Sequence, residues 1–173
     1  MKGGGRVMDF EQLYNTYFKD VYLYIRKLSG NQHIAEEVTS ETFFKAIGSI
    51  ENFRKDCDFY VWLCQIAKNT YYSYLKKQKR ISHIEDFELE NMVDPHSCID
   101  DKIIIQEQTI KIQKLLHAIP EPYKEVFMWR VFADLSFKQI GQIFNKSDNW
   151  ACVTYHRART MLKNRLEDSY YEK

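Results

Sequence analysis

The sequence predicts an all-α protein made of two small helical domains, joined by an acidic flexible linker, with a helix-turn-helix in the C-terminal domain. Apolar residues recur at spacings of three and four along most of the 173 residues, and no stretch alternates apolar and polar residues as a strand would. An acidic stretch without periodicity separates the two helical halves. Near the C-terminus, one N-cap signal opens a short helix, and a second follows directly after the turn that ends it. This is the pattern of a helix-turn-helix.

Four segments follow from this pattern. They are a disordered N-terminus at 1–8, a helical domain at 9–82, an acidic linker at 83–101 and a second helical domain at 102–173. The first segment has no periodicity, and its three consecutive glycines disfavour a helix. Its Lys-Gly-Gly-Gly-Arg string also resembles a translated ribosome-binding sequence, so synthesis is expected to start at Val7 or Met8 instead of Met1.

Three helices are expected in the first domain. The first covers residues 10–29 and ends at Gly30, because glycine is a common C-terminal cap. The second covers about 31–48, and the third begins near Asp58, an N-cap candidate, and ends near residue 80. The core side of the second helix is expected to be Ile34, Ala35, Val38, Thr42, Ala46 and Ile47. The core side of the third is expected to be Trp62, Leu63, Ile66, Ala67, Thr70 and Tyr74.

Charge is unevenly distributed along the chain, although the net charge is only +1. The outer face of the second predicted helix is acidic at Glu36, Glu37 and Glu41, which by itself indicates a solvated face. Residues 68–80 hold five basic and no acidic side chains, whereas 83–101 hold seven acidic ones and no Lys or Arg. The C-terminal domain is again net basic. Two basic blocks separated by an acidic strip suit two surfaces that contact one polyanion, with the strip held away from it or facing another partner.

The second domain is expected to contain one helix at about 105–119, a second that starts after residues 120–122, and then the helix-turn-helix. The core stripe of the first is Ile105, Gln108, Ile112, Leu115, Leu116 and Ile119. The stripe of the second is Tyr123, Val126, Phe127, Arg130 and Val131. Ser136 and Gln139 form a capping box that opens the first helix of the helix-turn-helix.

The last predicted helix has two distinct faces. Ser147 caps it, after Asn145 has ended the preceding helix. Its inward stripe is Ala151, Tyr155, Ala158 and Leu162. Its outward face is Asp148, Asn149, Cys152, Val153, His156 and Arg157. A second helix held in this way presents such a face to the major groove of DNA; the alternative is an ordinary surface pair of helices.

Several classes of protein are not predicted. The cysteines have no C-x-x-C spacing, so neither a zinc site nor a disulfide scaffold is indicated, and no metal or cofactor is expected. No window approaches the roughly 18 apolar residues of a membrane span, and no signal peptide is present, so the expected location is the cytoplasm. Ser, His and acidic residues form no nucleophile motif, so an enzyme is not expected.

Four sequence motifs stand in order along the chain: AEEVTSETF at 35–43, FR at 53–54, WLCQIAKN at 62–69 and LSFKQIG at 135–141. Together they resemble bacterial RNA polymerase sigma factors of the extracytoplasmic-function (ECF) type, group 4 of the sigma-70 family. The resemblance implies binding to core RNA polymerase and promoter-specific transcription initiation, often in a stress response. One domain would read the −10 promoter element and the other the −35 element. The acidic linker would thread a polymerase channel that nucleic acid otherwise occupies.

The resemblance also assigns roles to individual residues. It implies that Glu36, Glu37 and Glu41 dock on the clamp helices of the polymerase β′ subunit. Contacts with the −10 element are implied for Arg54, Lys55, Asp56, Cys57, Asp58, Asn69, Tyr72, Lys76 and Lys77. Contacts with the −35 element are implied for Arg130, Ser147, Asn149, Cys152, Val153, His156 and Arg157. Tyr71 and Tyr74 are assigned to core packing instead.

The sequence departs from the family pattern at several of these positions. Lys55 and Cys57 replace the usual Gly and Ser of the loop that captures a flipped −10 base, so the selected base stays open. Asn149-Trp150 stands where many members have Gly-Thr. Cys152 and Val153 offer little hydrogen bonding, so readout of the −35 element is expected to depend more on DNA shape and phosphate contacts than on bidentate pairing.

The resemblance implies one further partner, an anti-sigma factor that is often membrane-anchored and can hold the protein at the inner face of the membrane. Two other interpretations remain open. A helix-turn-helix response regulator would bind DNA and recruit polymerase, but its receiver domain needs alternating strands and helices. A structural or interaction protein built from helical bundles would leave the basic block at 68–80 without a role.

Overall fold

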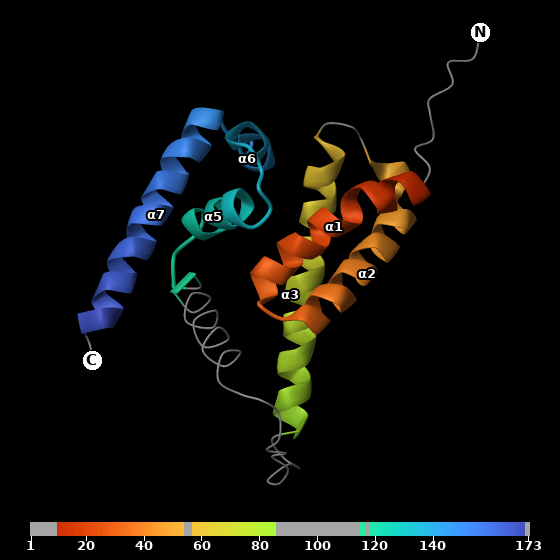
Figure 1. Cartoon of the computed structure of the whole chain (residues 1–173), viewed down its shortest axis with the longest axis horizontal. Coiled ribbons are helices and arrows are strands. Elements are labelled where there is room, and N and C mark those ends of the chain that lie inside the picture. Colours follow the sequence, from red (N-terminus) through yellow and green to blue (C-terminus); the bar gives the residue numbers. More distant parts are fainter. Residues whose placement is uncertain (1–9, 54–56, 86–114, 117, 172–173) are drawn as a thin grey trace. The chain divides into compact units, whose positions relative to one another are not determined.

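The computed structural model describes residues 10–53, 57–85, 115–116 and 118–171, and every regular element in these ranges is a helix (Figure 1). The all-α prediction is therefore confirmed for this part of the chain. Two compact units, Met1–Thr70 and Tyr71–Lys173, divide the chain, and each is described by itself. The predictions for the N-terminus, most of the acidic linker and most of the helix at 105–119 lie outside the described residues.

Two helices, α1 (Phe10–Ser29) and α2 (Gln32–Ser49), pack against each other in the first unit. Gly30 connects them with a φ of 68°, a left-handed conformation that glycine adopts without strain. Asn31 then caps α2, because its Oδ1 accepts a hydrogen bond of 3.1 Å from the amide of Ile34. The buried side chains of α1 are Leu13, Val21, Tyr24, Ile25 and Leu28. The sequence correctly predicts that the first helix ends at Gly30 and that the second begins directly after it.

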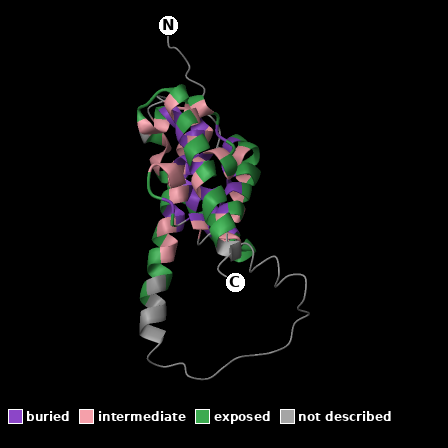
Figure 2. Cartoon of the chain, turned by 90° about the vertical axis from the view of Figure 1, so that its left-hand side faces the viewer, coloured by how far each residue is buried: buried purple, intermediate pink, exposed green. Residues whose placement is uncertain are grey.

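The inner face of α2 differs from the predicted stripe at four positions: Ile34 is only half-buried, Ile47 is exposed, and Thr39 and Phe43 are buried although they were not predicted. The sequence predicts Ile47 in the core, but this side chain is 47% exposed. The buried face consists of Ala35, Val38, Thr39, Thr42, Phe43 and Ala46 (Figure 2). Successive residues of a helix are about 100° apart, so Ile47 lies one step beyond a face that ends at Ala46.

A short 3₁₀ helix (Ile50–Asn52) leads toward α3 (Phe59–Glu85). Asp58 caps α3 as predicted, because its Oδ1 accepts a 2.8 Å hydrogen bond from the amide of Tyr60. The helix continues to Glu85, beyond the predicted end near residue 80. The prediction was wrong there because no Gly or Pro interrupts the chain before position 95, and loss of apolar periodicity does not by itself end a helix.

Aromatic rings hold the start of α3 to its surroundings in the first unit. The ring of Phe53 lies 5.1 Å from that of Phe59 and 5.2 Å from that of Trp62. Tyr17 of α1 stacks on Tyr60 with ring centroids 6.0 Å apart. These contacts fix both ends of the loop at 54–58, whose residues 54–56 lie outside the described part of the chain.

In the second unit α5 (Tyr123–Val131) packs against both α6 (Phe137–Phe144) and α7 (Asp148–Tyr171). Val131, which belongs to the predicted stripe of this helix, is 37% exposed, whereas Trp129, which does not, is fully buried. A helix that is covered on two sides buries more than one stripe. Periodicity alone therefore could not select its inner face.

Side-chain caps define the predicted helix-turn-helix. The hydroxyl of Ser136 accepts a 3.3 Å hydrogen bond from the amide of Gln139, whose Oε1 accepts a 2.9 Å bond from the amide of Ser136. Asn145 ends α6 in the left-handed conformation, with φ 53°. Ser147 caps α7, because its Oγ accepts a 3.1 Å bond from the amide of Trp150. All three sequence signals are confirmed.

The turn between α6 and α7 approaches α6 closely at Gly141. The amide of Lys146 donates a 2.8 Å hydrogen bond to the carbonyl of Gly141. A Cβ added at Gly141 would stand 2.7 Å from the carbonyl oxygen of Lys146 and 3.0 Å from the backbone of Ser147. Only glycine fits here without moving the backbone of the turn.

None of the helices in the described part of the chain combines the length with the apolar character that a bilayer crossing demands. The described residues also contain no group of three or more His, Cys, Asp and Glu side chains placed to hold a metal ion.

Candidate functional site

The outer side of α2 carries an acidic face. Glu36, Glu37 and Glu41 are all exposed there. Gln32 donates a 2.9 Å hydrogen bond to Glu36 Oε1, and Lys45 Nζ lies 2.6 Å from Glu41 Oε1. An exposed pair of this kind contributes at most about 1 kcal/mol to stability, so these contacts orient the carboxylates more than they stabilise the fold.

Lys45 also connects this face to α3. Its Nζ donates a 3.3 Å hydrogen bond to Oγ1 of Thr70, which is 1% exposed. One ammonium group therefore bridges an exposed carboxylate on α2 and a buried hydroxyl on α3. The acidic face is consequently fixed relative to the middle of α3.

Two exposed apolar side chains continue the outer side of α2, and the sequence analysis missed both. Phe44 is 77% exposed and Ile47 is 47% exposed. Side chains three or four positions apart lie on the same side of a helix. Phe44 is three positions from Glu41 and Ile47 is three positions from Phe44, so Phe44 adjoins the acidic face. The pair Phe43-Phe44 was the available signal, because adjacent residues about 100° apart cannot both point fully inward.

The proposed −10 surface is described only in part. Arg54, Lys55 and Asp56 lie outside the described residues. Cys57 is half-buried and Asp58 is exposed, and the carboxylate of Asp58 is engaged in capping α3. On α3 itself, Asn69, Lys76 and Lys77 are exposed and Tyr72 is half-buried.

Tyr71 belongs to the packed side of α3, as the sequence predicts. It is 6% exposed, and burial raises the pKa of its phenol to about 12. Tyr74 is half-buried. The hydroxyl of Tyr74 accepts a 3.1 Å hydrogen bond from the exposed Gln78, so core packing is confirmed for Tyr71 but not for Tyr74. The spacing of residues 69, 72 and 76 places them on one side of the helix.

The outward face of α7 stands opposite a buried one. Ala151 and Ala158 are fully buried and Thr154 is 5% exposed, whereas Val153 is 41% exposed. The outward residues Asp148, Asn149, Val153, His156 and Arg157 are exposed, and Cys152 is half-buried. Ser147 differs from the others, because its hydroxyl already caps the helix.

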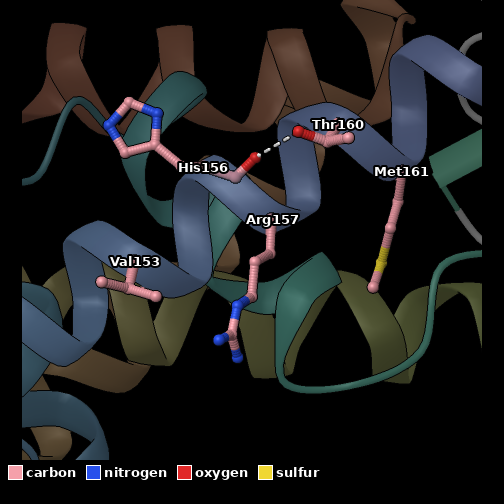
Figure 3. Close-up of a pocket in the computed structure, with 5 residues that line it drawn as sticks. All are labelled: Val153, His156, Arg157, Thr160 and Met161. Carbon is pink, nitrogen blue, oxygen red and sulfur yellow. Dashed lines mark hydrogen bonds between the residues drawn. The ribbon is translucent and has the colours of Figure 1, made fainter.

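A hollow runs along this outward face (Figure 3). It is lined by Val153, His156, Arg157, Thr160 and Met161, all of them on α7. Thr160 and Met161 were not predicted from the sequence, although both continue the face at helical spacing from residues 153, 156 and 157.

Arg130 is held at the turn that precedes α6. Its Nη1 donates a 3.0 Å hydrogen bond to the carbonyl of Leu135 and lies 3.4 Å from Oδ1 of Asp134. The guanidinium also lies 5.3 Å from the ring centroid of Phe137. Because its side chain is still 37% exposed, it can both brace the turn and present donors to solvent.

Two family models match this chain. The model for Sigma-70 region 2 covers residues 13–81, and the model for Sigma-70, region 4 covers residues 109–162. The first match contains α2 and most of α1 and α3, and the second contains α5, α6 and most of α7. These two regions in this order define a transcription initiation factor of the sigma-70 class.

Similarity to known relatives identifies the family within the sigma-70 class to which this chain belongs. The ECF RNA polymerase sigma-E factor of Haemophilus influenzae is 30% identical over 139 residues, which are 76% of this chain and 74% of the relative. The ECF RNA polymerase sigma factor SigW of Bacillus subtilis is 25% identical over 167 residues, 92% of this chain and 89% of the relative. The chain belongs to the ECF family of RNA polymerase sigma factors, which bind core polymerase and direct initiation at specific promoters.

Solved structures that share the fold include two protein complexes. One is the sigma factor RpoE of Bartonella quintana in complex with the anti-sigma factor NepR, with a TM-score of 0.61, 21% identity, and coverage of 93% of this chain and 98% of that one. The other is CnrH in complex with the cytosolic domain of CnrY, with a TM-score of 0.62, 16% identity, and coverage of 95% and 91%.

Proposed function

We propose that three surfaces of this sigma factor divide the work of initiation. The acidic face of α2 docks on the β′ clamp helices of core polymerase. The loop at 54–58 and the exposed row on α3 hold the displaced −10 strand, and the outward face of α7 reads the −35 element. The observation that carries this proposal is the two-sided character of α7, which buries Ala151 and Ala158 and exposes Val153, His156 and Arg157. Promoter-dependent transcription by core polymerase with the purified protein tests it.

Charge supports the docking role. Carboxylates on one side of α2 are suited to a basic partner helix, and attraction across such an interface raises the association rate and selects the partner. The exposed Phe44 next to them would supply the apolar contact that a charged rim alone lacks.

An anti-sigma factor is the proposed regulator, acting in the cytoplasm. The two solved structures named above contain such a partner, NepR, and a cytosolic partner domain, that of CnrY. Binding of this kind would cover the polymerase-docking and DNA-binding surfaces while the signal is absent. The protein itself would act by binding, without a catalytic step of its own.

Replacing Lys76 and Lys77 with alanine should weaken promoter binding by a similar factor on every sequence, because phosphate contacts carry no base identity. The slope of log K against log salt should become shallower by roughly 1 to 2, the value for two contacts on single-stranded DNA. Titration at several salt concentrations measures it. The double variant Lys19→Ala/Lys27→Ala removes two exposed lysines of α1 and serves as the control. An unchanged slope with altered base preference contradicts the assignment.

Replacing Arg157 with alanine should cost about 1–3 kcal/mol of binding at the −35 element if its guanidinium pairs with a base edge. Arg130→Ala should weaken binding without changing the preferred −35 sequence, and it should also lower the melting temperature because the turn loses its brace to Leu135. Selection from a promoter library with each variant distinguishes them. A changed preference in the Arg130 variant, or none in the Arg157 variant, contradicts this division of roles.

A further inference from the structure

Two parallel rows of side chains border the hollow on α7. Val153, Arg157 and Met161 follow one another at four-residue spacing, and His156 and Thr160 form the neighbouring row (Figure 3). In the first row, the cation of Arg157 lies between the apolar side chains of Val153 and Met161. The hollow therefore combines apolar contact area with one positive charge.

Hydrogen bonding is scarce in the part of the hollow next to Val153. Oγ1 of Thr160 donates a 3.1 Å hydrogen bond to the carbonyl of His156, so its proton is used within the helix. The side chains of Val153 and Met161 have no donor, and a thiol such as that of Cys152 is a weak one. Val153 can consequently offer a base edge nothing except apolar contact.

Val153 has no packing role that explains it. It is 41% exposed, while its neighbours Ala151 and Thr154 are 0% and 5% exposed. A β-branched residue on a solvated helix face also has a lower helix propensity than alanine or lysine. Its side chain is thus available for a partner.

We infer that Val153 binds the C5-methyl group of a thymine in the −35 element. The edges of the bases in the major groove are otherwise made of hydrogen-bond donors and acceptors, and the thymine methyl is the one apolar group among them. Arg157, one turn along the same row, takes an acceptor of a neighbouring nucleotide. This inference rests on the proposed function, in which α7 faces the −35 element.

The test removes the methyl group from the DNA. Full-length protein with core polymerase first selects its −35 element from a library, and each thymine of that element is then replaced singly by deoxyuridine. One replacement should weaken promoter binding by roughly threefold to fivefold, the equivalent of one buried methyl group. The other replacements should change binding less than twofold.

Three variants assign the methyl to Val153. Val153→Ala should bind thymine and deoxyuridine promoters equally, since its side chain no longer reaches the groove. Val153→Thr should keep the discrimination, because it retains one methyl branch in the same position. Val131→Ala makes the same truncation at another exposed valine, 37% exposed on α5, and should behave as the wild type.

The outcomes separate this inference from the function on which it rests. Selection of an element without thymine on either strand, or equal discrimination by the wild type and Val153→Ala, overturns the inference. If Arg157→Ala still weakens −35 binding in that case, the proposed function stands. If no −35 element is selected at all, the proposed function fails and the inference fails with it.

Discussion

Replacing Gly141 with alanine is expected to lower the free energy of unfolding of the C-terminal unit by about 1–3 kcal/mol and to weaken −35 binding with it. The added Cβ would stand 2.7 Å from the carbonyl oxygen of Lys146, an atom of the backbone that cannot rotate away. The same turn is held by the 2.8 Å hydrogen bond from the Lys146 amide to Gly141. Relief of the overlap would therefore move α7 relative to α6. Thermal unfolding and −35 binding of the variant measure both effects.

Gly48 provides the matched control. It lies in the last turns of α2, and a Cβ added there meets nothing within 4 Å. Gly48→Ala should therefore stabilise the first unit by roughly 0.5–1 kcal/mol, because glycine disfavours a helix and nothing obstructs the methyl group. A Gly141→Ala protein as stable as the wild type would mean that the turn is not packed as described.

Reversing charge at Glu36 and Glu37 to lysine is expected to weaken binding to core polymerase by about 100-fold. Repulsion would replace attraction across the docking interface, and like charges in contact cost several kcal/mol. Both side chains are exposed, so circular dichroism and the melting temperature should stay close to those of the wild type. Equilibrium binding of the labelled variant to core polymerase gives the result.

A second pair of adjacent acids controls for the change in net charge. Glu167 and Asp168 are exposed on α7, outside the proposed docking surface. Glu167→Lys/Asp168→Lys changes the charge of the chain by the same amount and should bind core polymerase like the wild type. Equal loss in both double variants would assign the effect to overall charge and refute the docking face on α2.

Local signals explain what the sequence predicted correctly. Asn31, Ser136 and Ser147 each accept a hydrogen bond from the amide three residues ahead, so the bond depends on nearby residues alone. Helix starts could therefore be placed from the sequence. The outward face of α7 followed in the same way, because its inward stripe of Ala151 and Ala158 is strictly periodic.

Tertiary packing explains what the sequence could not supply. The inner side of α5 depends on two covering helices, so the buried Trp129 was missed. The exposed Phe44 could be recognised only after Phe43 was known to occupy the core. The roles of individual promoter-contacting residues came from family resemblance, and they remain predictions for the experiments above.

The buried thiol of Cys64 can serve as an intrinsic probe of unfolding. Burial raises its pKa to about 12, so the thiol stays protonated and unreactive at pH 8 while the protein is folded. Cys57 and Cys152 are half-buried and lie at the two proposed promoter contacts. In a Cys98→Ser background, alkylation rates at these two positions would footprint bound DNA element by element. Labelling of Cys64 would occur only when the first unit unfolds. The alkylation rate of Cys64 would therefore measure unfolding in the same sample.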